Sequence, residues 1–319
     1  HRQRGARRRD ELRLYPPNLT RLTPAKGLLT ILKAFLSIIL LLDKKVFMNL
    51  YTTALSIAGS DPSGGAGIQA DIKTMSALGV YAMTAITAIT VQNTVGVRDV
   101  AGVAPEIVGG QIDAVFDDIR PDAVKIGMLF SADTVRVVAD RLVARAASNV
   151  VLDPVMVATS GDKLITDEAI DMIVKRLIPV ATLITPNANE ARLLTGTSDI
   201  TLQIAALRSL GAKNILLKGG DRDIDSDMSV DYLAVENSDT PVLLESRRVD
   251  TTNTHGTGCT LSSAIASFLA RGFDLTESVS KAKYYITEAL RHGAGITIGH
   301  GHGPVNHLFS PTPAIINSK

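Results

Sequence analysis

Short, mostly apolar runs alternate with runs in which apolar residues recur every three or four positions, from residue 53 to about residue 292. The first two runs show both patterns. Residues 53–58 (TALSIA) are a short apolar run that predicts a strand, whereas residues 66–78 place Ile68, Ile72 and Met75 at helical spacing. By the same criteria we predict further strands at 81–90, 123–126, 149–152, 181–185 and 214–218, and further helices at 105–119, 132–146, 167–177, from about 189, 201–210, 258–271 and 276–292.

This alternation is typical of a mostly parallel sheet covered by helices on both faces, so we expect an α/β fold with three layers, α/β/α. Residues 232–235 and 242–249 depart from the repeat, because no helical run separates them, and they predict an antiparallel pair. No linker, low-complexity tract or repeat interrupts residues 48–310. We therefore predict one domain over 48–310 and a C-terminal tail at 311–319.

Residues 1–47 differ in character from the rest of the chain. An arginine-rich start runs into an apolar stretch, residues 28–42, that is interrupted by Lys33. About 20 apolar residues are needed to span a bilayer as a helix, and this stretch is shorter. Met48 lies five residues before the first predicted strand. We predict that the functional protein begins at Met48 and that residues 1–47 are an extension outside its fold; a membrane anchor is the alternative.

Composition narrows the classes of partner. The net charge is +1, aromatic residues make up 4% of the chain and Trp is absent, so neither a basic surface nor an aromatic platform indicates a nucleic-acid partner. The single cysteine, Cys259, has no partner for an intramolecular disulfide, which is consistent with a reducing compartment. We expect a cytoplasmic protein that acts on a small molecule, without a membrane partner.

A glycine-rich turn at residues 253–259 (NTHGTGC) follows one predicted strand and opens the predicted helix 258–271. Glycines at a helix start expose backbone N–H groups to an anion, and the helix dipole favours negative charge there. The turn therefore predicts a phosphate site. Cys259 lies in the first helical turn, where a thiol pKa can be lowered and the thiolate can act as a base. A small buried thiol that only packs the turn is the alternative.

Polar residues also follow the predicted parallel strands, at the sheet edge where such folds bind ligands. Asp153 and Glu190 come after two of these strands, and Lys218 ends a third. The acids could hold Mg²⁺ beside nucleotide phosphates, and the lysine could bind phosphate oxygens. Helix caps or solvated carboxylates, and a surface lysine, are the alternatives. Glycines in the loop 59–65 either let the backbone turn or let it approach a substrate closely.

Taken together, these segments resemble one protein family both in their order along the chain and in their amino-acid sequences. The collinear segments are AGSDPSGGAGIQADIKT (58–74), TAITVQNT (87–94), KIGML (125–129), LDPVMVATSGDKL (152–164), ITPNANEA (184–191), LLKGGD (216–221) and NTHGTGCTLSSA (253–264). The set is similar to the hydroxymethylpyrimidine/phosphomethylpyrimidine kinases of thiamine biosynthesis, which have a ribokinase-like fold. The resemblance spans about residues 50–308 and leaves residues 1–47 without a counterpart.

The resemblance implies two successive ATP-dependent phosphorylations of a hydroxymethyl pyrimidine, with ATP and Mg²⁺ bound, by a homodimer. It also implies roles for individual residues. Cys259 takes the position where most ribokinase-fold kinases carry Asp, and the cysteine fits this subfamily. The implied assignments are Gln92, Gly59, Asp71 and Met128 in the pyrimidine pocket, Asn187 and Lys218 at the ATP phosphates, Asp153 and Glu190 near Mg²⁺, and Gly256, Thr257 and Gly258 in an anion hole next to Cys259.

Two other functions remain open on the sequence. Some relatives with this fold and motif set phosphorylate pyridoxal, so a pyridoxal kinase is the nearest enzymatic alternative. A catalytically idle pyrimidine-binding protein or a membrane-tethered regulator is an alternative of another class. That alternative requires a damaged kinase site, yet every chemical position expected from the resemblance is occupied.

Overall fold

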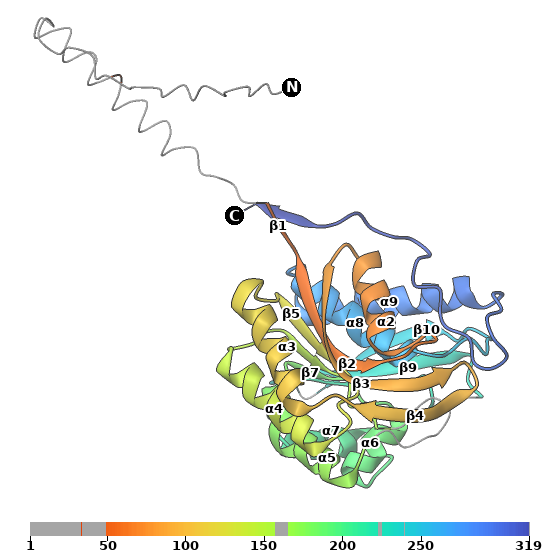
Figure 1. Ribbon diagram of the computed structural model, residues 1–319. Coiled ribbons are helices and arrows are strands. Elements are labelled where there is room, and N and C mark those ends of the chain that lie inside the picture. The colour runs from red at the N-terminus through yellow and green to blue at the C-terminus, as the bar shows by residue number, and fades with distance from the viewer. Residues whose placement is uncertain (1–32, 34–48, 157–164, 223–224, 239, 319) are drawn as a thin grey trace, which may run out of the picture. The chain divides into compact units, whose positions relative to one another are not determined.

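A nine-stranded sheet with the strand order β10-β9-β8-β7-β6-β5-β2-β3-β4 forms the centre of the fold (Figure 1). The computed structural model describes residues 33, 49–156, 165–222, 225–238 and 240–318, and residues 49–318 belong to one unit. The strands are β2 (Thr53–Ser60), β3 (Tyr81–Asn93), β4 (Gly96–Gly102), β5 (Ala123–Ile126), β6 (Val150–Leu152), β7 (Leu183–Ile184), β8 (Ile215–Leu217), β9 (Met228–Ala234) and β10 (Val242–Arg247).

The central part of the sheet is parallel and its edges are antiparallel. Strands β3, β2, β5, β6, β7 and β8 pair in parallel with their neighbours. Strand β4 adds antiparallel to β3 at one edge, and β9 and β10 add antiparallel at the other. The predicted mostly parallel sheet and the predicted antiparallel pair are therefore confirmed.

Helices cover both faces of this sheet, which confirms the three layers (Figure 1). One face packs on α3 (Pro105–Asp118), α4 (Ala132–Ala144), α5 (Asp167–Met172) with its continuation Ile173–Leu177, α6 (Ala188–Thr195) and α7 (Ile200–Ser209). The other face packs on α2 (Gly67–Ala77), α8 (Thr257–Ala270) and α9 (Leu275–Gly293).

Side chains of each strand alternate between these two faces. Leu55 and Ile57 belong to the apolar core beneath α3 and α4, whereas the intervening Ser56 points to the opposite side. The same alternation places Lys125 of β5 on the side of α2 and α8. Buried polar side chains are thereby concentrated between the sheet and these two helices.

Two parts of the fold differ from the sequence-based predictions. Strand β4 was not predicted, because its sequence GVRDVAG has the charged and glycine residues of a loop, and its side chains lie mostly in contact with solvent. The second difference concerns the predicted C-terminal tail, 311–319: its residues up to Ser318 belong to the same unit as the rest of the fold. Strand β11 (Ile316–Ser318) pairs antiparallel with β1 (Asn49–Tyr51), and the N–H of Thr312 donates to the carbonyl of Ala77.

Within the described residues, every helix is too short or too polar to cross a bilayer. The apolar stretch 28–42 on which the membrane-anchor alternative depends lies outside them, apart from Lys33. Residues 157–164, the second part of the segment LDPVMVATSGDKL, lie outside them as well.

Candidate active site

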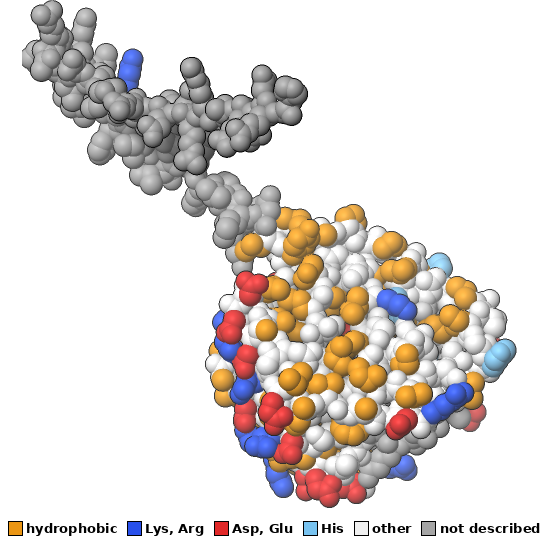
Figure 2. All heavy atoms as spheres, viewed as in Figure 1, with side chains coloured by type: hydrophobic (Ala, Val, Ile, Leu, Met, Phe, Trp, Pro, Cys, Tyr) orange, Lys and Arg blue, Asp and Glu red, His pale blue; other side chains and the backbone are white. Residues whose placement is uncertain are grey.

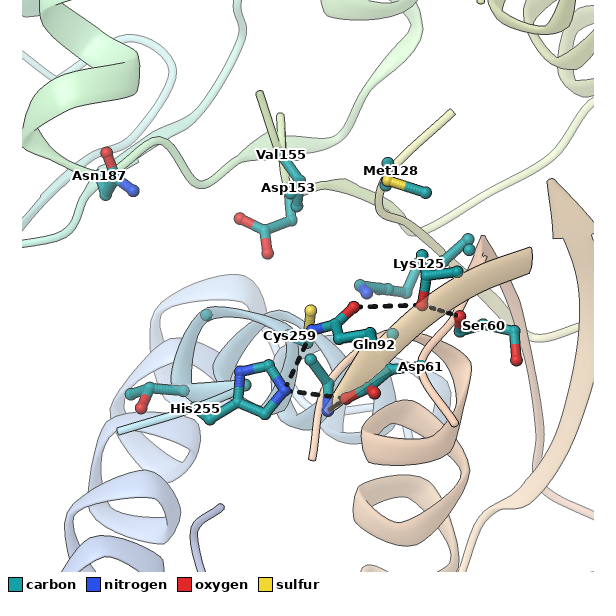
Figure 3. A pocket seen from close by; sticks show the side chains of 18 of the residues that line it. Ser60, Asp61, Gln92, Lys125, Met128, Asp153, Val155, Asn187, His255 and Cys259 are labelled. Atoms are coloured by element: carbon teal, nitrogen blue, oxygen red, sulfur yellow. Dashed lines mark hydrogen bonds and ion pairs between the residues drawn. The ribbon is translucent and has the colours of Figure 1, made fainter. Parts of the chain in front are cut away.

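Two adjoining pockets open at the carboxyl ends of the parallel strands. The smaller has a cavity volume of ≈ 160 Å³ and lies among the ends of β2, β3, β5 and the start of α8 (Figure 3). The larger, of ≈ 1060 Å³, extends towards β9, β10 and α9. Both pockets are lined by Asn187, Glu190, Lys218, Thr254, Thr257 and Gly258. A small and a large ligand could therefore meet at these shared residues.

The glycine turn before α8 forms the boundary between the pockets. Gly256 precedes the helix with φ 78°, in the left-handed region, and no side chain caps the helix start. A Cβ at Gly256 would overlap the carbonyl oxygen of Gly65, so both the conformation and the space require glycine there. The N–H of Thr257 donates to the carbonyl of Thr254 at 3.2 Å, and the next N–H groups at the start of α8 belong to Gly258 and Cys259, which line the pocket.

Cys259 lies two positions into α8, and its thiol points into the smaller pocket (Figure 3). Burial raises the pKa of this thiol to about 11, although the Lys125 ammonium and the backbone N–H of Gly67 act in the opposite direction. At neutral pH the thiol is therefore protonated in the free protein. A helix N-terminus can lower a thiol pKa, but here the loss of hydration has the larger effect.

Lys218 joins the two acids that the sequence placed near the phosphates. Its Nζ lies 2.7 Å from Asp153 Oδ1 and 3.7 Å from Glu190 Oε2. A Cβ at Gly258 would lie 3.3 Å from the same Nζ and 3.5 Å from Asp153 Oδ2. The ammonium, the carboxylates and the start of α8 therefore surround one small volume.

Burial favours the neutral form of both carboxyl groups, but their net pKa shifts are opposite. It would raise the pKa of Asp153, but the nearby Lys218 and Lys125 ammonium groups outweigh it and hold that pKa below its ordinary value. Burial raises the pKa of Glu190 to about 7; the Asp153 charge adds to the rise, while Lys218 opposes it. The pair thus supplies one firmly ionised carboxylate and one that titrates near neutral pH.

Glu190 and Asn187 also build the start of α6. The N–H of Glu190 donates to Asn187 Oδ1 at 2.9 Å, and the N–H of Asn187 donates to Glu190 Oε2 at 2.8 Å. This reciprocal pair is a capping box. The helix-cap alternative is therefore realised for Glu190, although both side chains line the pockets as well.

The carboxylates of Asp153 and Glu190 are hard oxygen donors of the kind that Mg²⁺ accepts, usually together with waters and substrate phosphates. Beside Lys218 and the start of α8, these two side chains are the residues that would hold Mg²⁺, which would offset phosphate charge there. Among the described residues no group of three or more His, Cys, Asp and Glu side chains is arranged to hold a metal ion by itself.

Three of the residues implied for the pyrimidine do line the smaller pocket: Gln92, Gly59 and Met128. A Cβ at Gly59 would overlap the terminal methyl group of Met128, so glycine leaves room for the methionine against the wall. Gln92 lies near the end of β3 with its amide towards the cavity (Figure 3). The structure thus brings these three residues together around one cavity.

Asp71 is the exception, because it does not line the pocket. It is fully buried in α2, where it accepts hydrogen bonds from Lys125 Nζ at 2.8 and 2.9 Å, from Ser56 Oγ at 2.5 Å and from Ser263 Oγ at 2.7 Å. Lys125 does line the pocket and is also fully buried. The expected position of Asp71 in the pocket lining is therefore wrong: Asp71 is the charge partner beneath a lysine that faces the cavity.

Sequence reasoning gave no role to Lys125, Asp61 or His255, which also line this pocket. His255 Nε2 lies 2.8 Å from Asp61 Oδ2, and both side chains are buried. All three residues stood inside segments already singled out, KIGML, AGSDPSGG and NTHGTGC. Their side chains meet only in the folded chain, so spacing along the sequence could not pair them.

Comparisons with known proteins give one consistent result. A family model described as phosphomethylpyrimidine kinase matches residues 61–306. A hydroxymethylpyrimidine/phosphomethylpyrimidine kinase of Rhizobium meliloti is 48% identical over 261 residues, which cover 80% of this chain and 96% of that protein.

Solved structures of two kinds of kinase share this fold. An ADP complex of Bacillus subtilis pyridoxal kinase is similar with a TM-score of 0.73 and 35% identity, covering 81% of this chain and 97% of that one. A phosphomethylpyrimidine kinase from Clostridium difficile is similar with a TM-score of 0.65 and 44% identity, covering 75% of this chain and 99% of that one.

Proposed function

Because this chain belongs to the phosphomethylpyrimidine kinase family, we propose that it phosphorylates 4-amino-5-hydroxymethyl-2-methylpyrimidine with ATP. The first product is the monophosphate and the second is the diphosphate, as steps of thiamine diphosphate biosynthesis. The enzyme is a phosphotransferase with a ribokinase-like fold. The resemblance of the seven sequence segments to the family is confirmed by these matches.

The observation that carries this function is the meeting of a small and a large pocket at the start of α8. A single-ring acceptor suits the smaller cavity, and a nucleotide suits the larger. Their shared residues, among them Lys218 and Gly258, would then lie at the phosphoryl group in transfer. Phosphoryl transfer depends mainly on positioning and on stabilising the charge of the transferring group, and this junction offers both.

Each residue of the junction has a role that follows from its chemistry. Backbone N–H groups of Gly256, Thr257 and Gly258 would surround the transferring phosphoryl oxygens as an anion hole. Lys218 would neutralise phosphate charge, and Asn187 would donate from its amide to the nucleotide phosphates. Cys259 faces the acceptor pocket, where it would contact the hydroxyl group that is phosphorylated.

Mg²⁺ would lie beside Asp153 and Glu190. Bound there with the nucleotide, it would offset negative charge on the phosphate oxygens. Asp153 is ready for this role because its pKa is held low, whereas Glu190, with a pKa of about 7, becomes a full carboxylate only above neutral pH.

An ATP-consumption assay with three acceptors tests the function: the hydroxymethyl pyrimidine, its monophosphate and pyridoxal. We expect consumption with both pyrimidines, and only this function requires turnover of the monophosphate. Pyridoxal is included because solved structures of pyridoxal kinases share the fold, and a minor activity on it would be compatible. Turnover of pyridoxal alone would overturn the proposal, and turnover of none of the three would favour the idle binding protein.

We also propose that the working protein is a cytoplasmic homodimer. Exposed apolar side chains support a second copy as partner: Ile89 and Val91 of β3 and the adjacent Val95 are each about half exposed or more. Hydrophobic side chains are spread over the face on which β3 and β4 lie (Figures 1 and 2). Sedimentation at micromolar concentration should give twice the mass of one chain. For Val91→Glu the measured mass should fall to that of a single chain.

A further inference from the structure

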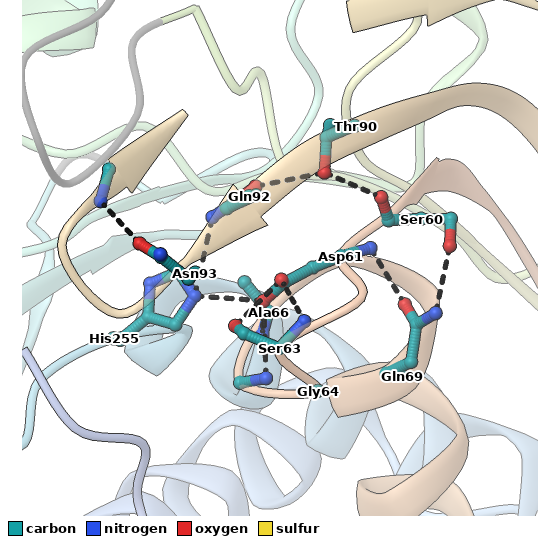
Figure 4. A network of polar contacts seen from close by, with 12 residues as sticks. Ser60, Asp61, Ser63, Gly64, Ala66, Gln69, Thr90, Gln92, Asn93 and His255 are labelled. Atoms are coloured by element: carbon teal, nitrogen blue, oxygen red, sulfur yellow. Dashed lines mark hydrogen bonds and ion pairs between the residues drawn. The ribbon is translucent and has the colours of Figure 1, made fainter. Parts of the chain in front are cut away.

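A line of polar contacts connects the first loop to the smaller pocket through His255 (Figure 4). His255 Nε2 lies 2.8 Å from Asp61 Oδ2 and 3.4 Å from the nearest atom of the Gln92 amide. The other end of that amide lies 3.2 Å from Thr90 Oγ1. The amide of Gln92 is thus in contact with a fixed polar group at each end.

The surroundings of Asp61 show which nitrogen of His255 carries a hydrogen: it is Nε2. The Asp61 carboxylate accepts hydrogen bonds from the N–H and the hydroxyl of Ser63, at 2.8 and 2.7 Å, and from the N–H groups of Gly65 and Ala66, at 3.1 and 2.8 Å. Burial would raise the pKa of Asp61, but these donors and His255 outweigh it and hold the pKa far below its ordinary value. An ionised carboxylate can only accept, so His255 Nε2 carries a hydrogen.

The other end of the amide is fixed by Thr90. Its hydroxyl has one proton, and the carbonyl oxygen of Ser60, 2.9 Å away, can only accept. With this proton on the shorter contact, to Ser60, Thr90 Oγ1 accepts from the Gln92 amide. When the amide nitrogen faces Thr90 and the amide oxygen faces His255, Thr90 accepts from the amide. The single Nε2 hydrogen of His255, donated mainly to Asp61 at 2.8 Å, is then shared with the amide oxygen as a weaker, three-centre contact at 3.4 Å. The opposite orientation, drawn in Figure 4, sets the amide N–H group against the N–H of His255.

We propose that His255, held by Asp61, is a positioning residue that selects this orientation of the Gln92 amide and so determines which heterocycle edge the pocket accepts. One N–H and one lone pair of the amide remain for a ligand. They complement an edge on which a ring nitrogen accepts beside an amino group that donates. The inference rests on the proposed function, in which the acceptor is a 4-aminopyrimidine.

The 4-oxo analogue of the substrate is the probe for this selection. Its ring N–H donates and its oxygen accepts, so it requires the amide in the opposite orientation. Wild-type enzyme should use the 4-amino compound much better than the 4-oxo analogue. In His255→Phe only Thr90 holds the amide, and the amide can turn when the Thr90 hydroxyl redirects its proton from Ser60 to the amide oxygen. We expect the ratio of kcat/KM for the two compounds to fall about tenfold. The matched variant His302→Phe, at an exposed histidine outside the pocket lining, should keep the wild-type ratio.

Two further variants distinguish a role of His255 in positioning Gln92 from a purely structural role in the glycine turn. His255→Gln, which can still donate towards Asp61, should restore most of the ratio. In a Gln92→Ala background, His255→Phe should change the ratio no further, because His255 acts through Gln92. If Phe does not fit beside Gly65, His255→Leu serves the same comparison, with folding checked by thermal melting.

The outcomes distinguish this inference from the function on which it rests. If His255→Phe slows both compounds equally, or if its effect persists without Gln92, the positioning role is wrong while the kinase function stands. If wild-type enzyme phosphorylates neither compound, the proposed function itself fails.

Discussion

Cys259 poses the sharpest question for a single residue, because its thiol faces the acceptor pocket while its pKa is raised to about 11. A base must be deprotonated to accept a proton. If the thiolate is the base, kcat/KM for the pyrimidine should still rise with pH near pH 9 in wild-type enzyme. The profile of Cys259→Ala should be flat over the same range.

Cys259→Ala should also reduce kcat about 100-fold or more while the KM for ATP changes little, because Cys259 does not line the larger pocket, in which we propose that the nucleotide binds. Steady-state kinetics with each substrate varied in turn measure both effects. Turnover close to that of wild type would exclude an essential base and leave the thiol as part of the pocket wall.

Glu190 should make the free protein less stable as pH rises. Its folded-state pKa of about 7 lies above the ordinary value of 4.5, so its stabilising contribution is complete below about pH 4.5 and is lost as pH rises through 7. Glu190→Gln removes this titration and keeps an acceptor for the capping box.

The melting temperature of Glu190→Gln relative to wild type should therefore increase from pH 5 to pH 8, corresponding to a loss in wild type on the order of 3 kcal/mol. Glu245→Gln, at an exposed glutamate of β10, is the control. A constant difference between Glu190→Gln and wild type would show that Glu190 does not titrate in this window.

For helix α8, the position of its first turn depends on Gly256. Alanine at this position would be strained at φ 78° and would overlap the carbonyl oxygen of Gly65. We expect Gly256→Ala to destabilise the fold by at least about 2 kcal/mol and to abolish most activity. Denaturant unfolding and the kinase assay measure the two effects.

Gly110 offers the contrasting glycine. It lies within α3, is exposed, and a Cβ there would have no neighbour within 4 Å. Gly110→Ala should stabilise the protein by about 0.5–1 kcal/mol, since alanine favours a helix interior. Equal effects of the two substitutions would contradict the special conformation of Gly256.

Most elements could be predicted because their apolar spacing is local. The helices α2, α3, α8 and α9 carry it within their own sequence, and the short parallel strands β5 to β8 are apolar except for Lys125. Strand β4 could not be predicted, because an edge strand contacts solvent and needs no apolar pattern. Strand β1 could not be predicted either, because its pairing partner β11 lies at the far end of the described chain.

Site residues could be predicted only where the position of the residue in its helix or strand is enough to place it at the site. Glycines at a helix start, and Asp153 or Lys218 at strand ends, follow from the topology of a parallel sheet. Asp71 and Lys125 did not follow, because whether a charged side chain lines a cavity or pairs beneath it depends on packing between β5, α2 and α8.

At the scale of the whole molecule, residues 312–318 should contribute to stability. The N–H groups of Thr312 and Ile315 donate to the carbonyls of Ala77 and Gly79, at 2.7 and 2.8 Å, and the N–H of Thr52 donates to the carbonyl of Ile315 at 3.0 Å. A chain that ends at Ser310 loses these bonds and the β1–β11 pair. We expect a loss of about 3 kcal/mol, measured by denaturant unfolding.

A chain that begins at Met48 is the matched comparison for this deletion. We propose that residues 1–47 lie outside the functional fold, so this chain should keep the stability and the kinase activity of the full chain. A large loss on removing residues 1–47, or none on removing residues 311–319, would show that the boundaries of the domain lie elsewhere.

The pairing of β1 with β11 has a consequence for the order of events during synthesis. Asn49 is opposite Ser318, so β1 leaves the ribosome long before its partner strand exists. Strands β2 and β3 can pair early, since only α2 separates them. The parallel core can therefore assemble while translation proceeds, whereas the two-stranded sheet closes only after release of residue 318, as a late and non-local step.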